Sequence, residues 1–291
     1  MKWSRADALG LIGAGLILPS CARGNSRAIR IGSKNFSENI TVAEIYALAL
    51  EHAGFQVERH MNLGSTQIAT AAMQRGDIQL YPEYTGTGLI DVLHLPPMHD
   101  ARAIFATIKR EYERRYQLTW LSPAPGNNSQ GLAMTQKAAA QYRVRTLSEC
   151  SRAAPQLRLA AVPEFVARAD ALPGLQRFYG GFKFKSVRTF DIGLQYEALA
   201  RGDADVATAF TTDARILADN LVVLADDRHF WPPYNIAPVV RLDALKSFGP
   251  SLRSALDNVS PGLTDSVLRR VNYDVDILKR DPAAVAAEFL H

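Results

Sequence analysis

The sequence predicts an α/β protein built as two similar lobes with a ligand cleft between them. Strand-like and helix-like segments alternate over residues 29–87 and again over 157–213, which is typical of largely parallel sheets covered by helices. In both stretches a helix ends in Arg-Gly-Asp, and a short strand then leads to an aromatic residue and a threonine. Residues 230–238 contain three prolines and therefore predict an extended crossover between the lobes.

The first lobe opens with a predicted strand at residues 28–32. A polar turn follows, in which Asn35 and Ser37 are candidates to cap the next helix. Apolar residues at helical spacing predict that helix over 38–52, and Gly54 is its stop signal.

The alternation then continues through the first lobe. A strand is expected at 55–58, and a second helix at 67–74 that ends at Gly76. The next strand, 78–81, is expected to give way at Pro82 to an aromatic loop. In open α/β sheets ligands bind outside the carboxyl ends of the strands, so this loop is predicted to face the cleft.

The second lobe repeats this order, and its last strand is followed by a loop that matches the first one. The helices after the proline-rich crossover, which pass through Leu252, Val267 and Val285, are expected to return to the first lobe. The predicted strands and helices of the second lobe are 157–162, 164–169, 182–187, 192–200 and the strand within 202–213.

The N-terminus predicts export from the cytoplasm. Lys2 and Arg5 precede an apolar run, 8–18, which is too short to span a bilayer as a helix and is typical of a secretory signal. Leu18-Pro19-Ser20-Cys21 is lipobox-like, so Cys21 is the candidate for lipidation; the alternative is plain cleavage and a soluble periplasmic protein. The expected organisation is a signal peptide at 1–21, a tether at 22–28, lobe 1 at 29–129 and 232–291, and lobe 2 at 130–231.

Composition and motifs exclude several function classes. Hydrophobic residues make up 47% of the chain and the formal net charge is only +4, so the chain is not a disordered one. Lys and Arg form no run that would suggest a nucleic-acid arm. The chain has neither a Gly-x-Ser-x-Gly elbow nor a Walker-type loop, and its six histidines lack metal-site spacing. We therefore expect no enzyme, no cofactor and no metal site, and we interpret Glu83 and Asp213 as acids that brace loops.

Five runs of the sequence are specific enough to point to a family. They are 31–38, 62–66, 76–88, 212–216 and 230–238, with Tyr-Pro-Glu-Tyr-Thr-Gly-Thr and Pro-Pro-Tyr-Asn the most specific among them. These runs resemble those of the glycine betaine, choline and carnitine-binding proteins of osmoprotectant ABC importers. The resemblance implies a periplasmic-binding-protein fold, type II-like, with two crossovers. It also implies a monomeric receptor outside the cytoplasm that captures a quaternary ammonium compound by lobe closure and hands it to an ABC permease.

The resemblance also implies site residues. Lys34, Thr87 and Arg168 match the positions that hold the ligand carboxylate, and Tyr84 and Tyr234 match two walls of an aromatic box. A quaternary ammonium group cannot donate a hydrogen bond, so aromatic faces hold it through cation–π attraction and apolar contact.

Two positions of the predicted box depart from the family pattern. Gln130 and Phe210 stand where the family usually shows tyrosine, and Asn128 stands where an acidic residue is common. A box with fewer aromatic faces predicts weaker glycine betaine binding, by ~1–2 kcal/mol. The alternatives are a cargo that is another amine or amino-acid derivative, and a lipid-anchored sensor domain with no role in transport.

Overall fold

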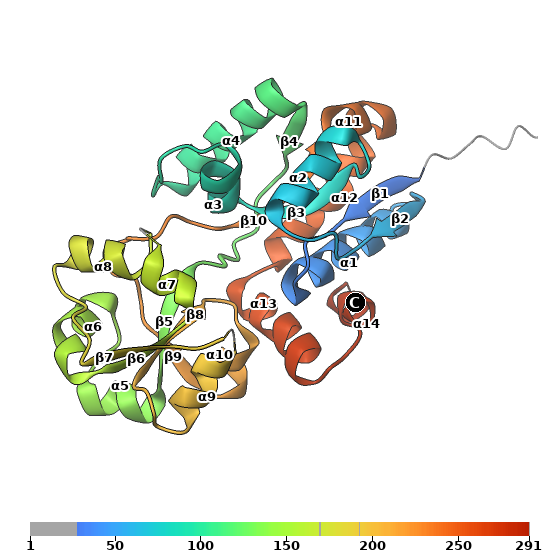
Figure 1. Ribbon diagram of the computed structural model, residues 1–291. Coiled ribbons are helices and arrows are strands. Elements are labelled where there is room, and N and C mark those ends of the chain that lie inside the picture. The colour runs from blue at the N-terminus through green and yellow to red at the C-terminus, as the bar shows by residue number, and fades with distance from the viewer. Residues whose placement is uncertain (1–27, 169, 192, 291) are drawn as a thin grey trace, which may run out of the picture.

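The computed structural model describes residues 28–168, 170–191 and 193–290 and contains two lobes, each built on a five-stranded mixed sheet (Figure 1). The sheet of the first lobe has the order β2-β1-β3-β10-β4. Strands β1, β2 and β3 run parallel, and β10 is antiparallel to its neighbours β3 and β4. The strands are β1 (Ile29–Gly32), β2 (Val57–His60), β3 (Leu80–Tyr84), β4 (Leu118–Trp120) and β10 (Ile236–Arg241).

The second sheet repeats this arrangement with the order β7-β6-β8-β5-β9. Strand β6 is parallel to β7 and β8, and β5 is antiparallel to β8 and β9. In each sheet, the first strand after a crossover lies between two other strands: β10 lies between β3 and β4, and β5 lies between β8 and β9. The strands are β5 (Gln130–Thr135), β6 (Arg158–Ala161), β7 (Ser186–Thr189), β8 (Val206–Phe210) and β9 (Leu221–Val223).

Helices cover the faces of both sheets (Figure 1). Those formed by first-lobe segments are α1 (Ser37–His52), α2 (Thr66–Arg75), α3 (Thr85–Thr87), η1 (Gly88–Val92), α4 (Ala101–Tyr116), α11 (Leu242–Phe248), α12 (Pro250–Val259), η3 (Ser260–Gly262), α13 (Asp265–Asn272), η4 (Tyr273–Ile277) and α14 (Pro282–Phe289). Those of the second lobe are α5 (Gln136–Tyr142), α6 (Leu147–Ala153), η2 (Ala154–Gln156), α7 (Pro163–Ala167), α8 (Leu172–Tyr179), α9 (Leu194–Ala200) and α10 (Ala214–Ala218).

Two crossovers connect the lobes, at residues 121–129 and 224–235, and they lie against each other. Asn127 and Asn235 form an isolated antiparallel bridge. The Tyr234 backbone N–H donates to Asn127 Oδ1 at 2.6 Å, and the Asn128 backbone N–H donates to the Tyr234 carbonyl at 3.2 Å. The connection between the lobes, called the hinge below, is therefore a hydrogen-bonded pair of extended segments.

Helix α1 is the centre of the first-lobe core. Ile45, Tyr46 and Leu50 are fully buried, because α1 packs on the sheet on one side and on α12 and α14 on the other. Because α1 is covered on nearly all sides, its buried residues also include polar ones such as Asn39 and Thr41. Its N-terminal turn points into the space between the lobes, which places the run 33–38 at the cleft (Figure 1).

Three sequence expectations were wrong in detail. Strand β3 does not stop at Pro82 but continues to Tyr84, because Pro82 lies opposite Pro238 of β10 and the two missing N–H groups fall at one shared position of the ladder. The strand expected at 182–187 lies instead at Ser186–Thr189. Neither Asn35 nor Ser37 caps α1: the N-cap is Phe36, with no side-chain bond.

The C-terminal helices return to the first lobe as expected, with one addition. Helices α12 and α14 pack on α1. Helix α13 contacts α1, and η4 contacts α14; both also contact α10 of the second lobe. Cys150 is buried in the second-lobe core, where burial raises the pKa of its thiol to about 12, so it is a packed residue rather than a reactive one.

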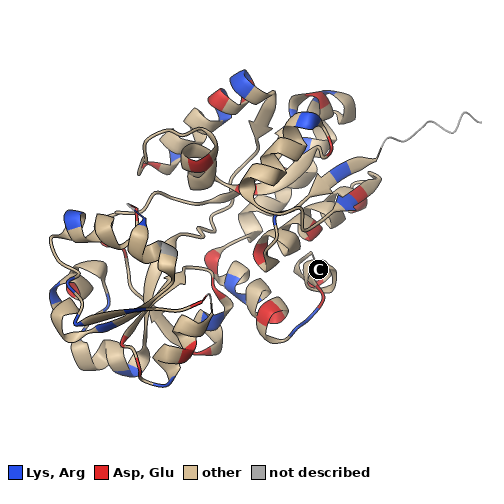
Figure 2. Ribbon diagram, in the orientation of Figure 1, with Lys and Arg blue, Asp and Glu red and all other residues tan. Residues whose placement is uncertain are grey.

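Charge and hydropathy add two observations. Lys and Arg are scattered among Asp and Glu over both lobes (Figure 2). Among the described helices, none is both long and apolar enough to cross a membrane. The lipidation candidate Cys21 and nearly all of the tether lie outside the described residues.

Candidate ligand-binding site

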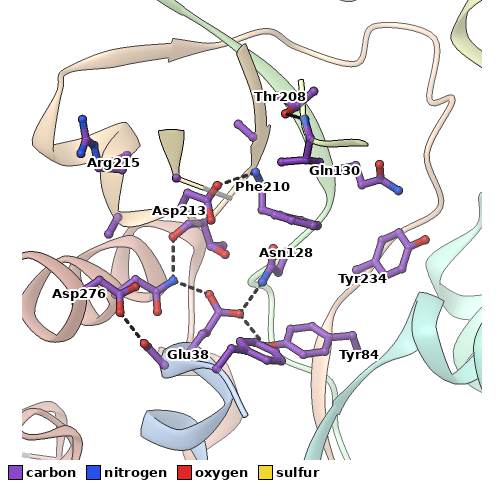
Figure 3. A pocket seen from close by; sticks show the side chains of 18 of the residues that line it. Glu38, Tyr84, Asn128, Gln130, Thr208, Phe210, Asp213, Arg215, Tyr234 and Asp276 are labelled. Atoms are coloured by element: carbon purple, nitrogen blue, oxygen red, sulfur yellow. Dashed lines mark hydrogen bonds between the residues drawn. The ribbon is translucent and has the colours of Figure 1, made fainter. Parts of the chain in front are cut away.

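A cavity of about 1060 Å³ lies between the lobes (Figure 3). Its lining comes from the first turn of α1, the end of β3, the start of β5, the end of β8 and the α13–η4 segment. Parallel strands of both sheets end here, which is where open α/β sheets bind ligands. All seven residues predicted as ligand contacts line this cavity: Lys34, Tyr84, Thr87, Gln130, Arg168, Phe210 and Tyr234.

Aromatic side chains approach the cavity from both lobes and from the hinge. The rings of Phe36 and Tyr84 lie stacked, with centroids 6.0 Å apart. Phe210, at the end of β8, is 50% exposed and points into the open space (Figure 3). Tyr234 lies on the second crossover and packs against Gly86, where a Cβ atom would come within 2.6 Å of the tyrosine ring. Gly86, in the Tyr-Thr-Gly-Thr run, is therefore needed because a side chain there would clash with the Tyr234 ring.

Gln130 is the cross-strand partner of Phe210 in the β5–β8 ladder, and both line the cavity. The two departures from the family pattern thus form one adjacent pair rather than two separate changes. Together they replace a double aromatic wall by one ring and one amide, which can both donate and accept hydrogen bonds.

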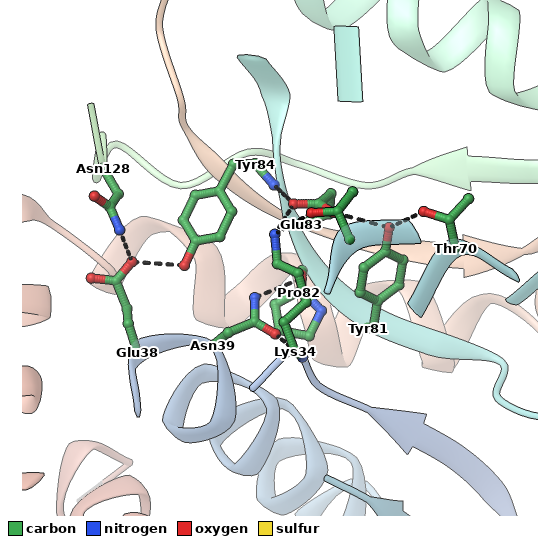
Figure 4. Close-up of polar contacts among 10 residues, drawn as sticks. Lys34, Glu38, Asn39, Thr70, Tyr81, Pro82, Glu83, Tyr84 and Asn128 are labelled. Carbon is green, nitrogen blue, oxygen red and sulfur yellow. Dashed lines mark hydrogen bonds and ion pairs between the residues drawn. The ribbon is translucent and has the colours of Figure 1, made fainter. Parts of the chain in front are cut away.

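Lys34 is buried and already has an anionic partner. Its ammonium group lies 2.5 Å from Glu83 Oε1 and 4.7 Å from the centroid of the Tyr84 ring (Figure 4). Glu83 is fully buried in β3, where it also accepts from the Tyr84 backbone N–H at 2.8 Å and the Tyr81 hydroxyl at 3.2 Å. It braces a strand rather than a loop, and its ion pair fixes Lys34 behind the Tyr84 ring.

Two further cations line the cavity, and each has a carboxylate partner. Arg168 binds Asp170 through Nε at 2.9 Å and through Nη2 at 2.5 Å. This contact raises the pKa of Arg168 and lowers the pKa of Asp170. Arg215 binds Asp219 at 2.7 Å. The positive charges on the lining are therefore largely balanced within the protein.

Glu38 has a different environment, and the sequence analysis did not single it out. It is 2% exposed and lies in the first turn of α1. Its carboxylate accepts from the Tyr84 hydroxyl at 2.8 Å, Asn128 Nδ2 at 2.9 Å and Asn272 Nδ2 at 2.7 Å (Figures 3 and 4). Burial and the nearby Glu38 carboxylate raise the pKa of Tyr84, which keeps its hydroxyl a donor. Within the described residues, Glu38 makes three neutral hydrogen bonds and no ion pair.

Two more carboxylates lie on the same side of the cavity. Asp213 accepts from the Phe210 backbone N–H at 2.9 Å and from the Tyr196 hydroxyl, and Asp276 accepts from Ser37. Burial raises the pKa of Asp213, and the Glu38 and Asp276 carboxylates raise it further. This lining therefore creates a negative potential that favours a cationic group.

Of Glu38, Asn272 and Asp276, which the sequence analysis overlooked, only Glu38 carried a signal in the sequence. Glu38 ends the run 31–38 that supports the family resemblance, so it could have been named. Asn272 and Asp276 reach the cavity from a segment more than 200 residues away, and no local pattern marks them. In the described part of the chain, no group of three or more His, Cys, Asp or Glu residues is arranged to hold a metal ion.

Comparison with known proteins agrees with this geometry. Residues 27–291 match the family model described as the substrate binding domain of ABC-type glycine betaine transport systems. The chain is 33% identical to the glycine-betaine-binding protein of Pseudomonas aeruginosa, over 97% of this chain and 90% of that one. It is also 33% identical to the ergothioneine transport permease/ergothioneine binding protein EgtU of Helicobacter pylori, over 89% of this chain but only 46% of that protein, so it spans about half of that relative.

The structural comparison gives the same result. A crystal structure of a glycine betaine/carnitine/choline ABC transporter protein superposes with a TM-score of 0.85 at 30% identity, and the match covers 90% of this chain and 97% of that one. The two-lobed α/β fold and the interlobe cavity are those of solute receptors that serve ABC importers outside the cytoplasm. The chain belongs to the family of substrate-binding domains of ABC-type glycine betaine transport systems.

Proposed function

We propose that the protein's cargo is a small compound with a quaternary ammonium group, held between the lobes and released to an ABC permease. The observation that carries this proposal is Glu38, a buried carboxylate at the cavity wall with no cationic partner among the described residues. It lies beside the Tyr84 ring, and Phe210 and Tyr234 provide further aromatic faces. Rings and an unneutralised carboxylate together suit a cation that cannot donate hydrogen bonds.

We assign the other end of a zwitterionic cargo to Lys34, Thr87 and Arg168. Their positions on one cavity lining support this, and so does the family resemblance. Asp170 uses Nε and Nη2 of Arg168, so Nη1 has donors for a second acceptor. A ligand carboxylate would share these cations with Glu83 and Asp170, which predicts moderate rather than very tight binding of zwitterions.

A second candidate cargo has a quaternary ammonium group and a hydrogen-bonding heterocycle. Gln130 favours it, because the amide next to Phe210 offers both a donor and an acceptor where an aromatic face is expected. The Helicobacter relative is named for ergothioneine, which is such a compound. A ligand panel distinguishes the two candidates.

We further propose that the protein acts by lobe closure, with the paired crossovers at 121–129 and 224–235 as the hinge. We also propose that Cys21 carries the lipid anchor and that the mature chain is a monomer. The proposed function includes no catalytic step. Mass spectrometry of the membrane fraction tests the anchor, because an unmodified N-terminus would contradict it. Solution scattering with saturating ligand tests closure, since an unchanged radius of gyration would speak against it.

The test of the cargo is thermal unfolding of residues 22–291 with glycine betaine, choline, carnitine, proline betaine and ergothioneine. Ligand at ~100 times its Kd stabilises the native state by about 2.7 kcal/mol, which shifts Tm by several degrees. Phe210→Ala should reduce the shift, because this ring is half exposed and lines the cavity. Phe178→Ala is the matched control: Phe178 is a 39% exposed phenylalanine of the same lobe that does not line this cavity. If no quaternary ammonium compound shifts Tm, the proposed cargo is wrong.

A further inference from the structure

We propose that Asn272 is a positioning residue that joins the two ligand walls across the lobes, through a buried path from the Thr212 carbonyl to Glu38 and Tyr84. The proposal rests on the proposed function only in that ligand affinity is one of its readouts. It concerns how the aromatic faces from different lobes are kept at the spacing that a ligand requires.

Asn272 reaches both lobes because of where its helix lies. It is the last residue of α13, which packs against α1 of the first lobe and against α10 of the second. Figure 1 shows α13 between these two helices. Although the sequence places this segment in the first lobe, α13 provides a third connection between the lobes, in addition to the two crossovers.

The amide of Asn272 uses both of its protons, one toward each lobe. Its Nδ2 atom donates to Glu38 Oε2 at 2.7 Å and to the Thr212 carbonyl at 2.8 Å. Asn272 is 5% exposed, Glu38 is 2% exposed and Thr212 is 1% exposed. Leaving a buried acceptor without its donor costs free energy, so these two hydrogen bonds hold the lobes in the orientation that satisfies both acceptors.

On the first-lobe side, the path continues to a predicted ligand wall. Glu38 Oε1 accepts from the Tyr84 hydroxyl at 2.8 Å and from Asn128 Nδ2 at 2.9 Å. Asn128 belongs to the first crossover. One carboxylate thus collects donors from the aromatic wall, the hinge and α13, and any shift of α13 changes the hydrogen bonding of the Tyr84 ring.

On the second-lobe side, α13 holds the segment that presents Phe210. Arg269, three residues before Asn272, donates from Nε to the Thr211 carbonyl at 2.7 Å. Residues three apart share a helix face, so Arg269 and Asn272 bind two successive carbonyls of this segment. The next residue back is Phe210, and the next one forward is Asp213, whose carboxylate accepts from the Phe210 N–H. The position of α13 therefore sets the position of the Phe210 ring relative to Tyr84.

The position of α13 therefore determines the fraction of protein molecules that is competent to bind ligand. If the contacts are lost, the lobes sample more orientations and the binding-competent fraction falls, which raises Kd in inverse proportion. Asn272→Ala should raise Kd by about 10-fold and broaden the distribution of interlobe distances in the ligand-free protein. Arg269→Ala should act in the same direction, and Arg269→Lys, which keeps a donor, should recover part of the loss.

The experiment combines calorimetry with glycine betaine and a ligand-free distance measurement. Spin labels at Gln56→Cys and Lys137→Cys, both exposed and in different lobes, report the interlobe distance, and buried Cys150 does not interfere. The control is Ser266→Ala, since Ser266 is an exposed residue of α13 whose hydroxyl bonds to Thr264 at the start of the same helix. It should leave both readouts unchanged.

A double-mutant cycle tests the path itself. Tyr84→Phe keeps the ring and removes only the hydroxyl that donates to Glu38. If Asn272 acts through Glu38, the effects of Asn272→Ala and Tyr84→Phe on Kd are non-additive. Additive effects, or wild-type Kd and distances in Asn272→Ala, would overturn the proposal. If the wild-type protein does not bind glycine betaine, the proposed function fails, and the ligand-free distances still decide this inference. If Asn272→Ala does not fold, the Arg269→Ala and Arg269→Lys pair decides it by the same distances.

Discussion

Restoring an aromatic residue at position 130 should strengthen the binding of quaternary ammonium compounds. Gln130 is the first residue of β5, is half-buried, lines the cavity and lies beside Phe210 in the ladder. In Gln130→Tyr the new ring would extend into the cavity rather than into a packed core. Directly opposed side chains on a sheet have Cβ atoms about 4.5–5.5 Å apart, so the tyrosine and Phe210 would form one continuous aromatic wall.

The size of the effect follows from the chemistry of the added face. A cation–π contact contributes about 0.5–1 kcal/mol at an exposed site and about 2 kcal/mol when it is desolvated. Position 130 is partly covered and becomes more so when the lobes close, so we expect a gain of ~1–2 kcal/mol, which is about 5- to 30-fold in Kd. A cargo that hydrogen-bonds to the glutamine amide should bind more weakly to the same variant.

Isothermal titration calorimetry with glycine betaine, choline and ergothioneine measures these changes. Gln130→Leu is the first control, because it adds apolar surface without a π face. Gln136→Tyr is the second, because Gln136 is exposed in the same lobe and does not line the cavity. An unchanged Kd in Gln130→Tyr, or an equal gain in Gln130→Leu, would refute the cation–π reasoning.

Three further predictions concern packing, burial and acid stability. Gly86→Ala should displace the Tyr234 ring, which lies 2.6 Å from the new Cβ position, and weaken ligand binding several-fold in calorimetry; a wild-type Kd would contradict this. Glu83→Gln leaves a buried ammonium unpaired and should destabilise the fold by about 3–5 kcal/mol in urea unfolding, so near-wild-type stability would count against the buried pair. Arg158 lowers the pKa of Asp205, so this pair stabilises the fold above the unfolded-state pKa of the carboxyl and loses that contribution as pH falls through its lowered folded value. Arg158→Gln should therefore be less stable than wild type at pH 7, by a difference that shrinks as pH falls below the unfolded-state pKa of the carboxyl, and a constant difference would refute the linkage.

The architecture could be predicted from the sequence because its signals are local. Helical spacing over 38–52 and the Gly76 stop come from neighbouring residues, and α1 and α2 begin and end within one residue of the expected positions. The repeated Arg-Gly-Asp pattern marks corresponding points in the two lobes. Strand ends face the cleft in such sheets, which placed the two aromatic loops there, and the family resemblance then named Tyr84 and Phe210, both of which line the cavity.

Tertiary structure decided the features that depend on distant contacts. The continuation of β3 past Pro82 depends on Pro238, which lies opposite it in a strand formed more than 150 residues later. A proline taken alone reads as a strand end, and only the pairing with β10 shows that the strand continues past it.

The charge balance of the site was likewise beyond the sequence. Lys34 and Arg168 were visible as positive residues, but their ion pairs with Glu83 and Asp170 appear only in the fold. Glu38, by contrast, gathers neutral donors from three separate segments, and Asn272 reaches it across 234 positions. The sequence by itself determined the alternation of strands and helices in the two lobes, because their periodicity is local, and it named site residues through the family resemblance. Only the tertiary structure decided which charges remain unbalanced there, because the electrostatic partner of a buried group depends on distance in space and not along the chain.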